Sequence, residues 1–247
     1  MFPVSERPWK ATLGRSIQLF RAFRVEQTDP ARFYGDLARD AAAHVSSYAP
    51  LAGATVLDVG GGPGYFADAF ERAGARYFAV DADVGEMSAA GKLRRGSVLG
   101  SGLQLPIRSA SIDICYSSNV LEHVPQPWTM ADEMVRVTRP GGVVFISYTT
   151  WYGPWGGHET SPWHYAGGRR AADRYERRHG RRPKNNYGRS LFRVTVREGL
   201  RYAAGVSGAA AIDVLPRYNP AWSHGLLRVP VLRELVTWNL VLVLRRT

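Results

Sequence analysis

One cysteine, Cys115, is all that the 247-residue chain contains. A single cysteine excludes an internal disulfide framework and any cysteine-rich zinc or iron–sulfur site. Long apolar runs are lacking too: the longest, residues 236–244, is interrupted by Asn239 and falls far short of the roughly 20 residues that a membrane-spanning helix needs. Behind the first charged residues there is no apolar stretch of signal-peptide length. We therefore expect a cytoplasmic protein whose contact with a membrane is limited to the inner membrane surface.

Acidic side chains are scarce relative to basic ones. The chain has 32 Lys and Arg against 21 Asp and Glu, a formal net charge of +11. The excess is uneven: residues 40–150 carry eight basic and eleven acidic side chains, whereas residues 151–190 carry nine and three. Any attraction to anions therefore belongs to the N-terminal arm and to roughly the last hundred residues. With 45% hydrophobic and 21% charged residues, the composition is that of a globular protein and excludes wholesale disorder.

Strand and helix patterns alternate regularly through the middle of the chain. The pattern predicts strands at residues 55–59, 76–81, 111–118 and 143–149, a short strand within residues 94–100, and helices at residues 65–74, 84–92 and 127–138. Beyond residue 190 it predicts helices at residues 194–205 and 231–236, and strands at residues 210–218 and 238–245 that pair antiparallel at the sheet edge. Such alternation is typical of an α/β fold, a mostly parallel sheet with helices on both faces.

The segment from Val56 to Ala67, VLDVGGGPGYFA, carries the most information. A strand that ends in glycines and leads into a helix lets a ligand approach bare backbone at the helix N-terminus. Asp81, at the end of the next strand, lies where a carboxylate can hold a ribose hydroxyl pair. This spacing fits both NAD and other adenosyl cofactors. Pro63 removes a backbone N–H from the loop, and Asp58 places a negative charge beside it, which favours a cationic ligand over a pyrophosphate.

Four strings in order, VLDVGGGPGYFA, AVDAD, LQLPIRSASIDICYSSNVLEHV and EMVRVTRPGGVVFIS, resemble class I S-adenosylmethionine (SAM)-dependent methyltransferases, among them the ubiquinone/menaquinone-type small-molecule enzymes. The resemblance covers about residues 54–149, and the abundance of Ala, Gly and Arg has an actinobacterial look. It implies a Rossmann-like sheet of seven strands with an antiparallel last strand. It also implies that Gly60, Gly62 and Gly64 line the methionyl part of SAM, that Asp58 helps to hold its amino group, and that Asn119 faces the sulfonium.

At the other end of the cofactor, the resemblance implies that Asp81 binds the ribose hydroxyls. Ala82 would lie beside the adenine, and Leu103 would pack on it. Relatives often place an acid before the LP turn to take the adenine amino group, whereas this chain has Ser101 there.

On this basis the chain divides into four parts. Residues 1–50 form an N-terminal helical arm or lid, residues 51–150 the SAM-binding core, residues 151–190 an inserted basic and aromatic substrate lobe, and residues 191–247 the C-terminal part of the sheet. In the arm, residues 9–26 predict a basic amphipathic helix with a stripe of Trp9, Leu13, Ile17, Phe20 and Phe23. That helix either packs over the domain or serves as a lid or membrane-surface helix.

The lobe supplies the candidates for a general base, His158 and His164, within GPWGGHETSPWHYAGG. A hydroxyl acceptor needs its proton removed by a histidine or carboxylate, whereas an amine or carbon acceptor does not. Both histidines could instead hold the loop together, and a metal site made from them and Glu159 has no known ligand spacing behind it. We therefore predict no metal. Glu122 and His123 belong to the family signature after the fourth strand, where they either support the loop or act in catalysis.

We predict a methyl transfer, with oxygen favoured as the methylated atom, to a small-molecule, glycan or lipid-linked acceptor. The arginine-rich run RRAADRYERRHGRRPKNNYGRS favours an anionic acceptor or an anionic membrane surface. Nucleic acid is disfavoured, because the chain lacks the Asn/Asp-Pro-Pro-Tyr motif of base amino methyltransferases and the second cysteine of carbon-5 pyrimidine chemistry. The alternatives are an RNA or protein methyltransferase that uses the basic run, and a non-catalytic SAM-fold binding subunit.

Overall fold

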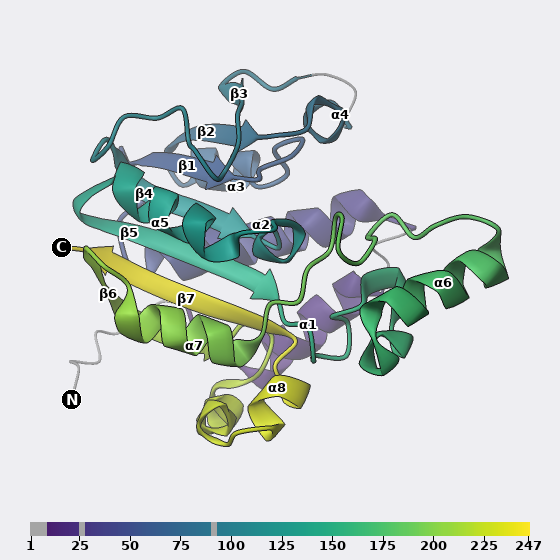
Figure 1. The fold of residues 1–247 in the computed structure, drawn as a ribbon. Helices are drawn as coiled ribbons and strands as arrows, with labels where there is room; N and C mark the ends of the chain where they lie inside the picture. Colours follow the sequence, from purple (N-terminus) through teal and green to yellow (C-terminus); the bar gives the residue numbers. More distant parts are fainter. Residues whose placement is uncertain (1–8, 25–27, 90–92) are drawn as a thin grey trace.

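A seven-stranded sheet forms the centre of the computed structural model, which describes residues 9–24, 28–89 and 93–247 (Figure 1). The strand order is β3-β2-β1-β4-β5-β7-β6. The strands are β1 (Thr55–Val59), β2 (Arg76–Asp81), β3 (Ser97–Leu99), β4 (Ile112–Ser118), β5 (Thr138–Thr149), β6 (Ala209–Pro216) and β7 (Asn239–Arg246). Strand β7 pairs antiparallel with both of its neighbours, β5 and β6, whereas the other pairs of described strands are parallel. The predicted fold class is thus confirmed, with β6 as the edge strand and β7 inside it.

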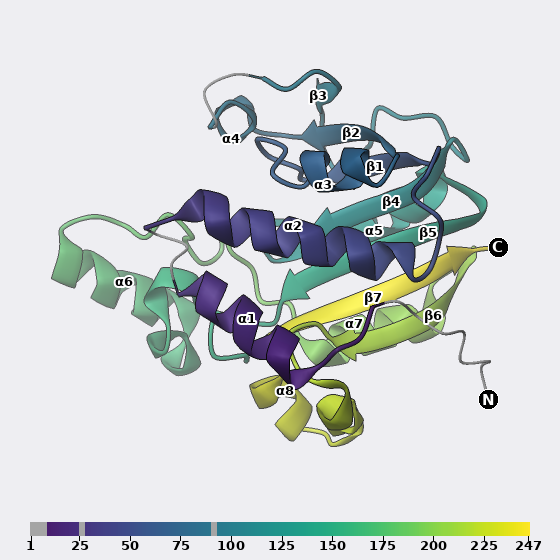
Figure 2. The ribbon, with the colours of Figure 1, turned by 180° about the vertical axis from the view of Figure 1, so that it is seen from behind.

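Helices cover both faces of the sheet. The α-helices are α1 (Leu13–Phe23), α2 (Pro30–Ser46), α3 (Ala67–Arg72), α4 (Val84–Met87), α5 (Pro127–Val137), α6 (Gly168–His179), α7 (Val196–Gly205) and α8 (Leu232–Val236). Helices α1, α2 and α3 lie on one face, whereas α5 and α7 lie on the other (Figures 1 and 2). Because both faces of β4 are covered, Tyr116 lies in one hydrophobic core and Cys115 in the other, as expected for a core cysteine.

Local sequence signals account for several helix starts. Asp83 accepts hydrogen bonds from the backbone of α4, as its position before the helix predicts. Thr195 and Glu198 form a capping box at the start of α7. The predicted helix at residues 84–92 is shorter than expected, because α4 ends at Met87, and residues 90–92 lie outside the described residues. Strand β5 is longer than predicted and includes Pro140, because the chain stays paired, with an irregular register, beside β4.

The side of helix α1 that packs against the rest of the protein is not the side predicted from its apolar stripe. Its buried residues are Leu19 and Ala22. Three stripe residues are exposed instead: Leu13, Ile17 and Phe20. The interpretation that the whole stripe packs over the domain is therefore wrong for its middle part. The predicted helix end at residues 25 and 26 lies outside the described residues.

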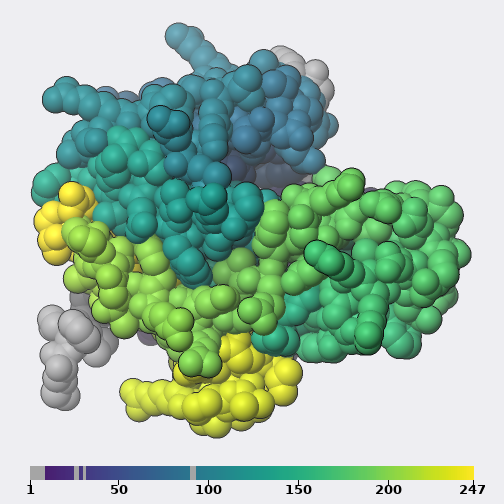
Figure 3. Space-filling view, in the orientation of Figure 1, coloured from purple at the N-terminus to yellow at the C-terminus, as the bar shows by residue number. Residues whose placement is uncertain are grey.

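Residues between β5 and α7 form a lobe at one end of the sheet. It contains two short 3-10 helices, η2 (His158–Thr160) and η3 (Trp163–Ala166), and the basic helix α6. Figure 3 shows this lobe, in green, projecting sideways from the rest of the molecule. Two further 3-10 helices are η1 (Leu121–His123), after β4, and η4 (Ala221–Arg228), before α8. None of the described helices has the length and apolar character needed to cross a bilayer.

Candidate active site

The loop between β1 and α3 has the shape expected of a ligand cradle. Gly60 has φ +79°, and a Cβ there would lie 2.4 Å from a side-chain carbon of Val120. Gly62 has φ +50°, but the space beside it is open. Glycine adopts a positive φ without strain at both positions, and at Gly60 it also avoids a clash with Val120. Gly64 donates its N–H to Gly61 O at 2.9 Å and closes the loop. The open side at Gly62 lets a ligand approach the backbone, so the loop fits a cofactor.

Asp58 is buried at the end of β1. Its Oδ2 accepts a 2.5 Å hydrogen bond from the hydroxyl of Tyr77. Burial raises the pKa of this carboxyl to about 7, the Tyr77 hydrogen bond opposes the shift, and the charge of Asp81 adds to it. No cationic side chain pairs with Asp58 among the described residues. A buried carboxyl that lacks a cation fits a ligand that carries one.

Asp81, at the end of β2, is fixed by two backbone groups. Its Oδ2 accepts from Gly62 N at 3.0 Å, and its Oδ1 accepts from Asp83 N at 2.9 Å. A carboxylate can accept about four hydrogen bonds. Asp81 therefore keeps acceptor positions on both oxygens, which is what a pair of ribose hydroxyls needs. Ala82, the next residue, is exposed.

The other predicted cofactor contacts lie on two loops. Ser101 Oγ accepts from Leu103 N at 3.1 Å and so shapes the turn, and the Leu103 side chain packs against the α5-side core. Asn119, directly after β4, has φ +57°. Its Oδ1 accepts from Asn239 Nδ2 at 2.7 Å, which fixes the orientation of the amide. Because β1, β2 and β4 run parallel, Asp58, Asp81 and Asn119 all lie at the carboxyl edge of the sheet.

A cluster of one glutamate and two histidines lies at the same edge. In the described part of the chain it is the one group of three such side chains whose possible metal-ligand atoms lie close together. One nitrogen or oxygen from each of Glu122, His123 and His158 lies within 4.8 Å of the other two. Glu122 and His123 come from η1 after β4, and His158 comes from η2 after β5. Because β4 and β5 are parallel neighbours, these two loops meet.

Backbone groups hold the cluster in place, and two of its polar atoms are left without partners among the described residues. Glu122 Oε1 accepts from Thr149 N at 2.9 Å, and His123 Nδ1 bonds to Ser190 O at 2.7 Å. Glu122 Oε2 and His158 Nε2 are buried and have no hydrogen-bond partner in the structure. Two buried polar atoms without partners are costly, and such atoms call for an explanation.

Burial also sets the protonation of His158. It lowers the pKa of the imidazole to about 4, while the Glu122 carboxylate opposes the shift and His123 and His164 add to it. At neutral pH the ring is therefore uncharged and carries a free lone pair. It can accept a proton, and the imidazolium that forms would face the Glu122 carboxylate.

His164 and Glu159 do not belong to this cluster. His164 is buried inside the lobe, in an edge contact with Trp151, with ring centroids 5.4 Å apart. Burial lowers its pKa as well. Glu159 accepts from Asn185 Nδ2 at 3.1 Å. His164 and Glu159 thus lie outside the cluster, whereas Glu122 and His123, for which the sequence left loop support and catalysis open, lie with His158.

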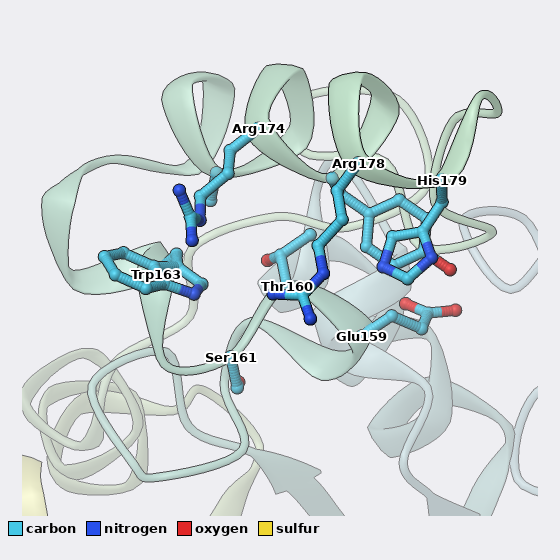
Figure 4. Close-up of a pocket in the computed structure, with 9 residues that line it drawn as sticks. Glu159, Thr160, Ser161, Trp163, Arg174, Arg178 and His179 are labelled. Carbon is cyan, nitrogen blue, oxygen red and sulfur yellow. The ribbon is translucent and has the colours of Figure 1, made fainter.

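A second feature of the lobe is a surface cavity of about 180 Å³ between α6 and η2–η3. Figure 4 shows Arg174, Arg178 and His179 pointing from α6 toward it. The Arg174 guanidinium lies 3.9 Å from the ring centroid of Trp163. Neither arginine forms an ion pair with another described residue. The cavity is therefore lined by two arginines, an aromatic wall and one carboxylate, that of Glu159.

Arg217 was not anticipated from the sequence. It follows β6, is fully buried, and donates from Nη1 to Ser118 Oγ and Ser147 Oγ, each at 2.7 Å. It thereby ties together the carboxyl ends of β4 and β5. The available signal was a lone arginine directly after an apolar strand.

The chain is similar in sequence to known methyltransferases. Residues 57–146 match the family model described as a methyltransferase domain. The chain is 56% identical to an uncharacterized methyltransferase of Mycolicibacterium gilvum, over 96% of both chains, and 55% identical to one of Mycobacterium tuberculosis, over 95% of this chain and 96% of the other.

Solved structures resemble it in fold. An S-adenosylmethionine-dependent methyltransferase from Mesorhizobium loti matches with a TM-score of 0.57 and 19% identity, over 85% of this chain and 98% of the other. A geranyl diphosphate C-methyltransferase from Streptomyces coelicolor, solved with S-adenosyl-L-homocysteine, matches with a TM-score of 0.53 and 14% identity, over 84% and 75%. The chain belongs to the methyltransferase family of these mycobacterial relatives, and its fold is that of class I SAM-dependent enzymes.

Proposed function

We propose that this methyltransferase methylates a hydroxyl oxygen of a small-molecule, glycan or lipid-linked acceptor, with His158 as the general base. The observation that carries the proposal is the pair of buried atoms without partners among the described residues, His158 Nε2 and Glu122 Oε2, at the carboxyl edge of the sheet. An acceptor hydroxyl placed between them would donate its one proton to His158 Nε2, with the Glu122 carboxylate facing the same place. Because its lowered pKa keeps His158 neutral, its Nε2 can take the hydroxyl proton as the oxygen–methyl bond forms. The Glu122 carboxylate would stabilise the resulting imidazolium.

The proposed cofactor contacts follow from the shape of the glycine loop between β1 and α3 and from the side chains at the strand ends. SAM, when bound, supplies a methyl group on a positively charged sulfur. Asp58 would pair with the methionyl ammonium, and the backbone of Gly60, Gly62 and Gly64 would line the same end. Asn119 would face the sulfonium from the end of β4. These residues align the reacting atoms, which is most of what an in-line displacement at an activated carbon requires.

The ribose and adenine would lie farther along the same edge. Asp81 would accept from the ribose hydroxyls, with Ala82 beside the adenine and Leu103 packed on it. Ser101 takes the place of the acid found in relatives, and its hydroxyl is already engaged by Leu103 N. We therefore expect Asp81 to contribute more to affinity than the adenine contacts do.

The lobe cavity favours an acceptor that carries an anion. Arg174 and Arg178 point into it and form no ion pair with another described residue, although Glu159 also lines the cavity; guanidinium groups match phosphate and carboxylate geometry. The cavity is next to η2, whose first residue is His158. A phosphate or carboxylate held there would anchor the acceptor close to the proposed base.

The exposed arginines of α6 favour one alternative, an RNA or protein methyltransferase. RNA binding through that helix would weaken steeply with salt, which filter binding at two ionic strengths measures. A second alternative, a non-catalytic SAM-fold subunit, predicts cofactor binding without turnover in any fraction.

The test uses methyl-tritiated SAM and extract fractions enriched in lipid, glycan or RNA. We expect label in the lipid or glycan fraction. His158→Gln should lower kcat by about 100-fold or more, and Glu122→Gln less, with unchanged affinity for S-adenosylhomocysteine. His164→Gln is the matched control: it should lower thermal stability but leave kcat of the folded enzyme near the wild-type value. Label in RNA alone, or full turnover by His158→Gln, would contradict the proposal.

A further inference from the structure

Large apolar side chains are exposed on two neighbouring elements, α1 and the η4–α8 segment. We call them the apolar face: Leu13, Ile17, Phe20, Trp222, Val231 and Leu235. Trp222 is 79% exposed and Val231 is 73% exposed. Single exposed apolar residues are ordinary, whereas a group of them on adjoining elements marks an interaction site.

Two contacts join the elements into one surface. At the start of α1, Ala221 N donates to Ala11 O at 2.7 Å. Toward the end of α1, the rings of Phe20 and Trp238 lie 5.6 Å apart. The exposed ridge of α1 therefore runs alongside η4–α8, and Figure 2 shows α1 next to α8 at the lower side of the molecule.

The backbone at Val231, whose side chain is exposed, has a strained conformation. Its φ is +69°, in the left-handed region that β-branched residues rarely adopt. Strained residues of this kind cluster where a function requires them. The strain holds an apolar side chain out in water, on the part of the chain that protrudes at the bottom of Figure 3.

The charge around the apolar face is positive. Residues 9–24 contain four basic side chains and no carboxylate. Of these, Arg15 pairs with Asp40, whereas Lys10, Arg21 and Arg24 are exposed and have no ion-pair partner among the described residues.

On the other element, Arg228 is exposed. Glu234, the one carboxylate of η4–α8, accepts from Val196 N and Arg197 N at 2.9 and 2.8 Å and so caps α7. The apolar face therefore has a basic rim and no free carboxylate among the described residues.

We propose that the apolar face docks this enzyme on an anionic membrane surface. Protruding apolar side chains, a tryptophan among them, with basic residues around them are suited to the boundary between headgroups and acyl chains. A second copy of this chain fits less well, because a two-fold interface would bring the same basic rims together. The protruding side chains of Trp222 and Val231 also favour insertion into a soft surface over docking in a groove.

Aromatic contacts connect α1 and the residue that follows α8 by two positions, Trp238, with Trp155 of the candidate active-site lobe. The ring of Trp155 lies 5.1 Å from that of Phe23 and 6.3 Å from that of Trp238. A docked enzyme would thus hold the lobe close to the headgroups, where a lipid-linked acceptor presents its polar part. The docking inference rests on the apolar face alone and does not depend on the proposed methyl transfer.

Vesicle sedimentation without SAM or acceptor tests the inference. The full chain should sediment with vesicles of equal parts phosphatidylcholine and phosphatidylglycerol, and added salt should weaken this. It should stay in solution with phosphatidylcholine alone. The double variant Trp222→Ser, Val231→Ser should partition at least about tenfold more weakly. Both side chains are largely exposed, so the fold should tolerate the change.

The matched control is Val84→Ser, Leu99→Ser, which removes two exposed apolar side chains far from the apolar face. It should bind vesicles like the wild type. Equal binding by the Trp222/Val231 variant, or no wild-type binding to anionic vesicles, would overturn the inference. A concentration-dependent dimer that the same variant dissociates, without vesicle binding, would assign the face to a second copy instead.

Discussion

Replacing Asp58 by Asn should make the protein more stable at alkaline pH and weaken its hold on the cofactor. The pKa of Asp58 is raised from 3.8 to about 7, chiefly by burial. A carboxyl whose folded pKa lies above its unfolded pKa costs stability when ionised. The cost is absent below about pH 4, grows as pH rises toward 7, and is constant above that.

The magnitude follows from the shift. Between about pH 5 and pH 8, Asp58 should remove about 3 kcal/mol from the free energy of unfolding, because about two pH units of that interval lie below the folded pKa at about 1.4 kcal/mol each. The variant Asp58→Asn cannot titrate and should lack this fall. Urea unfolding curves at the two pH values measure it. Asp68→Asn, which removes an exposed carboxylate from α3, is the control and should keep the wild-type pH dependence.

Cofactor binding should change in the opposite direction. Only ionised Asp58 can pair with an ammonium group, so calorimetry should show wild-type affinity for S-adenosylhomocysteine falling by up to about tenfold per pH unit below pH 7. The Asp58→Asn variant should bind weakly and show little of this dependence. Identical pH dependence of unfolding in both proteins would refute the raised pKa. Unchanged affinity in the variant would refute the role of Asp58.

Three further outcomes test the site. Because the pKa of His158 is about 4, kcat at saturating SAM should stay constant down to about pH 5, whereas the KM for SAM should rise below about pH 7; initial rates across this range separate the two groups. Arg174→Gln should raise the KM of an anionic acceptor about tenfold with little change in kcat, while Arg170→Gln, outside the cavity, should not. Gly60→Ala should unfold at a lower temperature, because the new Cβ meets a valine side chain at 2.4 Å. Gly62→Ala, beside open space, should cost about 1 kcal/mol and mainly lose S-adenosylhomocysteine binding in calorimetry.

Sequence reasoning predicted the sheet well because its signals are local. Glycines that end β1, a carboxylate that ends β2 and a proline that opens α5 each lie within a few residues of the turn they determine. The orientation of α1 could not be predicted in this way. Its stripe of large apolar residues is a stronger pattern than Leu19 and Ala22, yet the smaller pair is buried. Which side of an amphipathic helix faces the protein depends on what else covers the sheet.

Only part of the candidate active-site cluster of Glu122, His123 and His158 could be predicted from the sequence. His158 was predicted as a base, but its partners lie about 35 residues earlier, in a different loop. Nothing local connects Glu122 with His158. The connection arises because β4 and β5 are parallel neighbours, so that the loops leaving their carboxyl ends meet. The available signal was that reactive side chains follow directly after two parallel neighbouring strands. Arg217 likewise follows directly after a strand, β6.

The uneven charge of the chain matches two ligands of opposite sign. The core, residues 40–150, is the acidic part, and it holds Asp58 and Asp81 at the edge where a sulfonium cofactor would lie. The lobe and α1 are basic, and they carry the arginine-lined cavity and the rim of the apolar face. Asp58 is buried and the rim is exposed, so salt should screen the outer charges far more than the inner one. Under the two proposals made above, added salt would weaken the hold on an anionic acceptor or membrane while the cofactor stays bound.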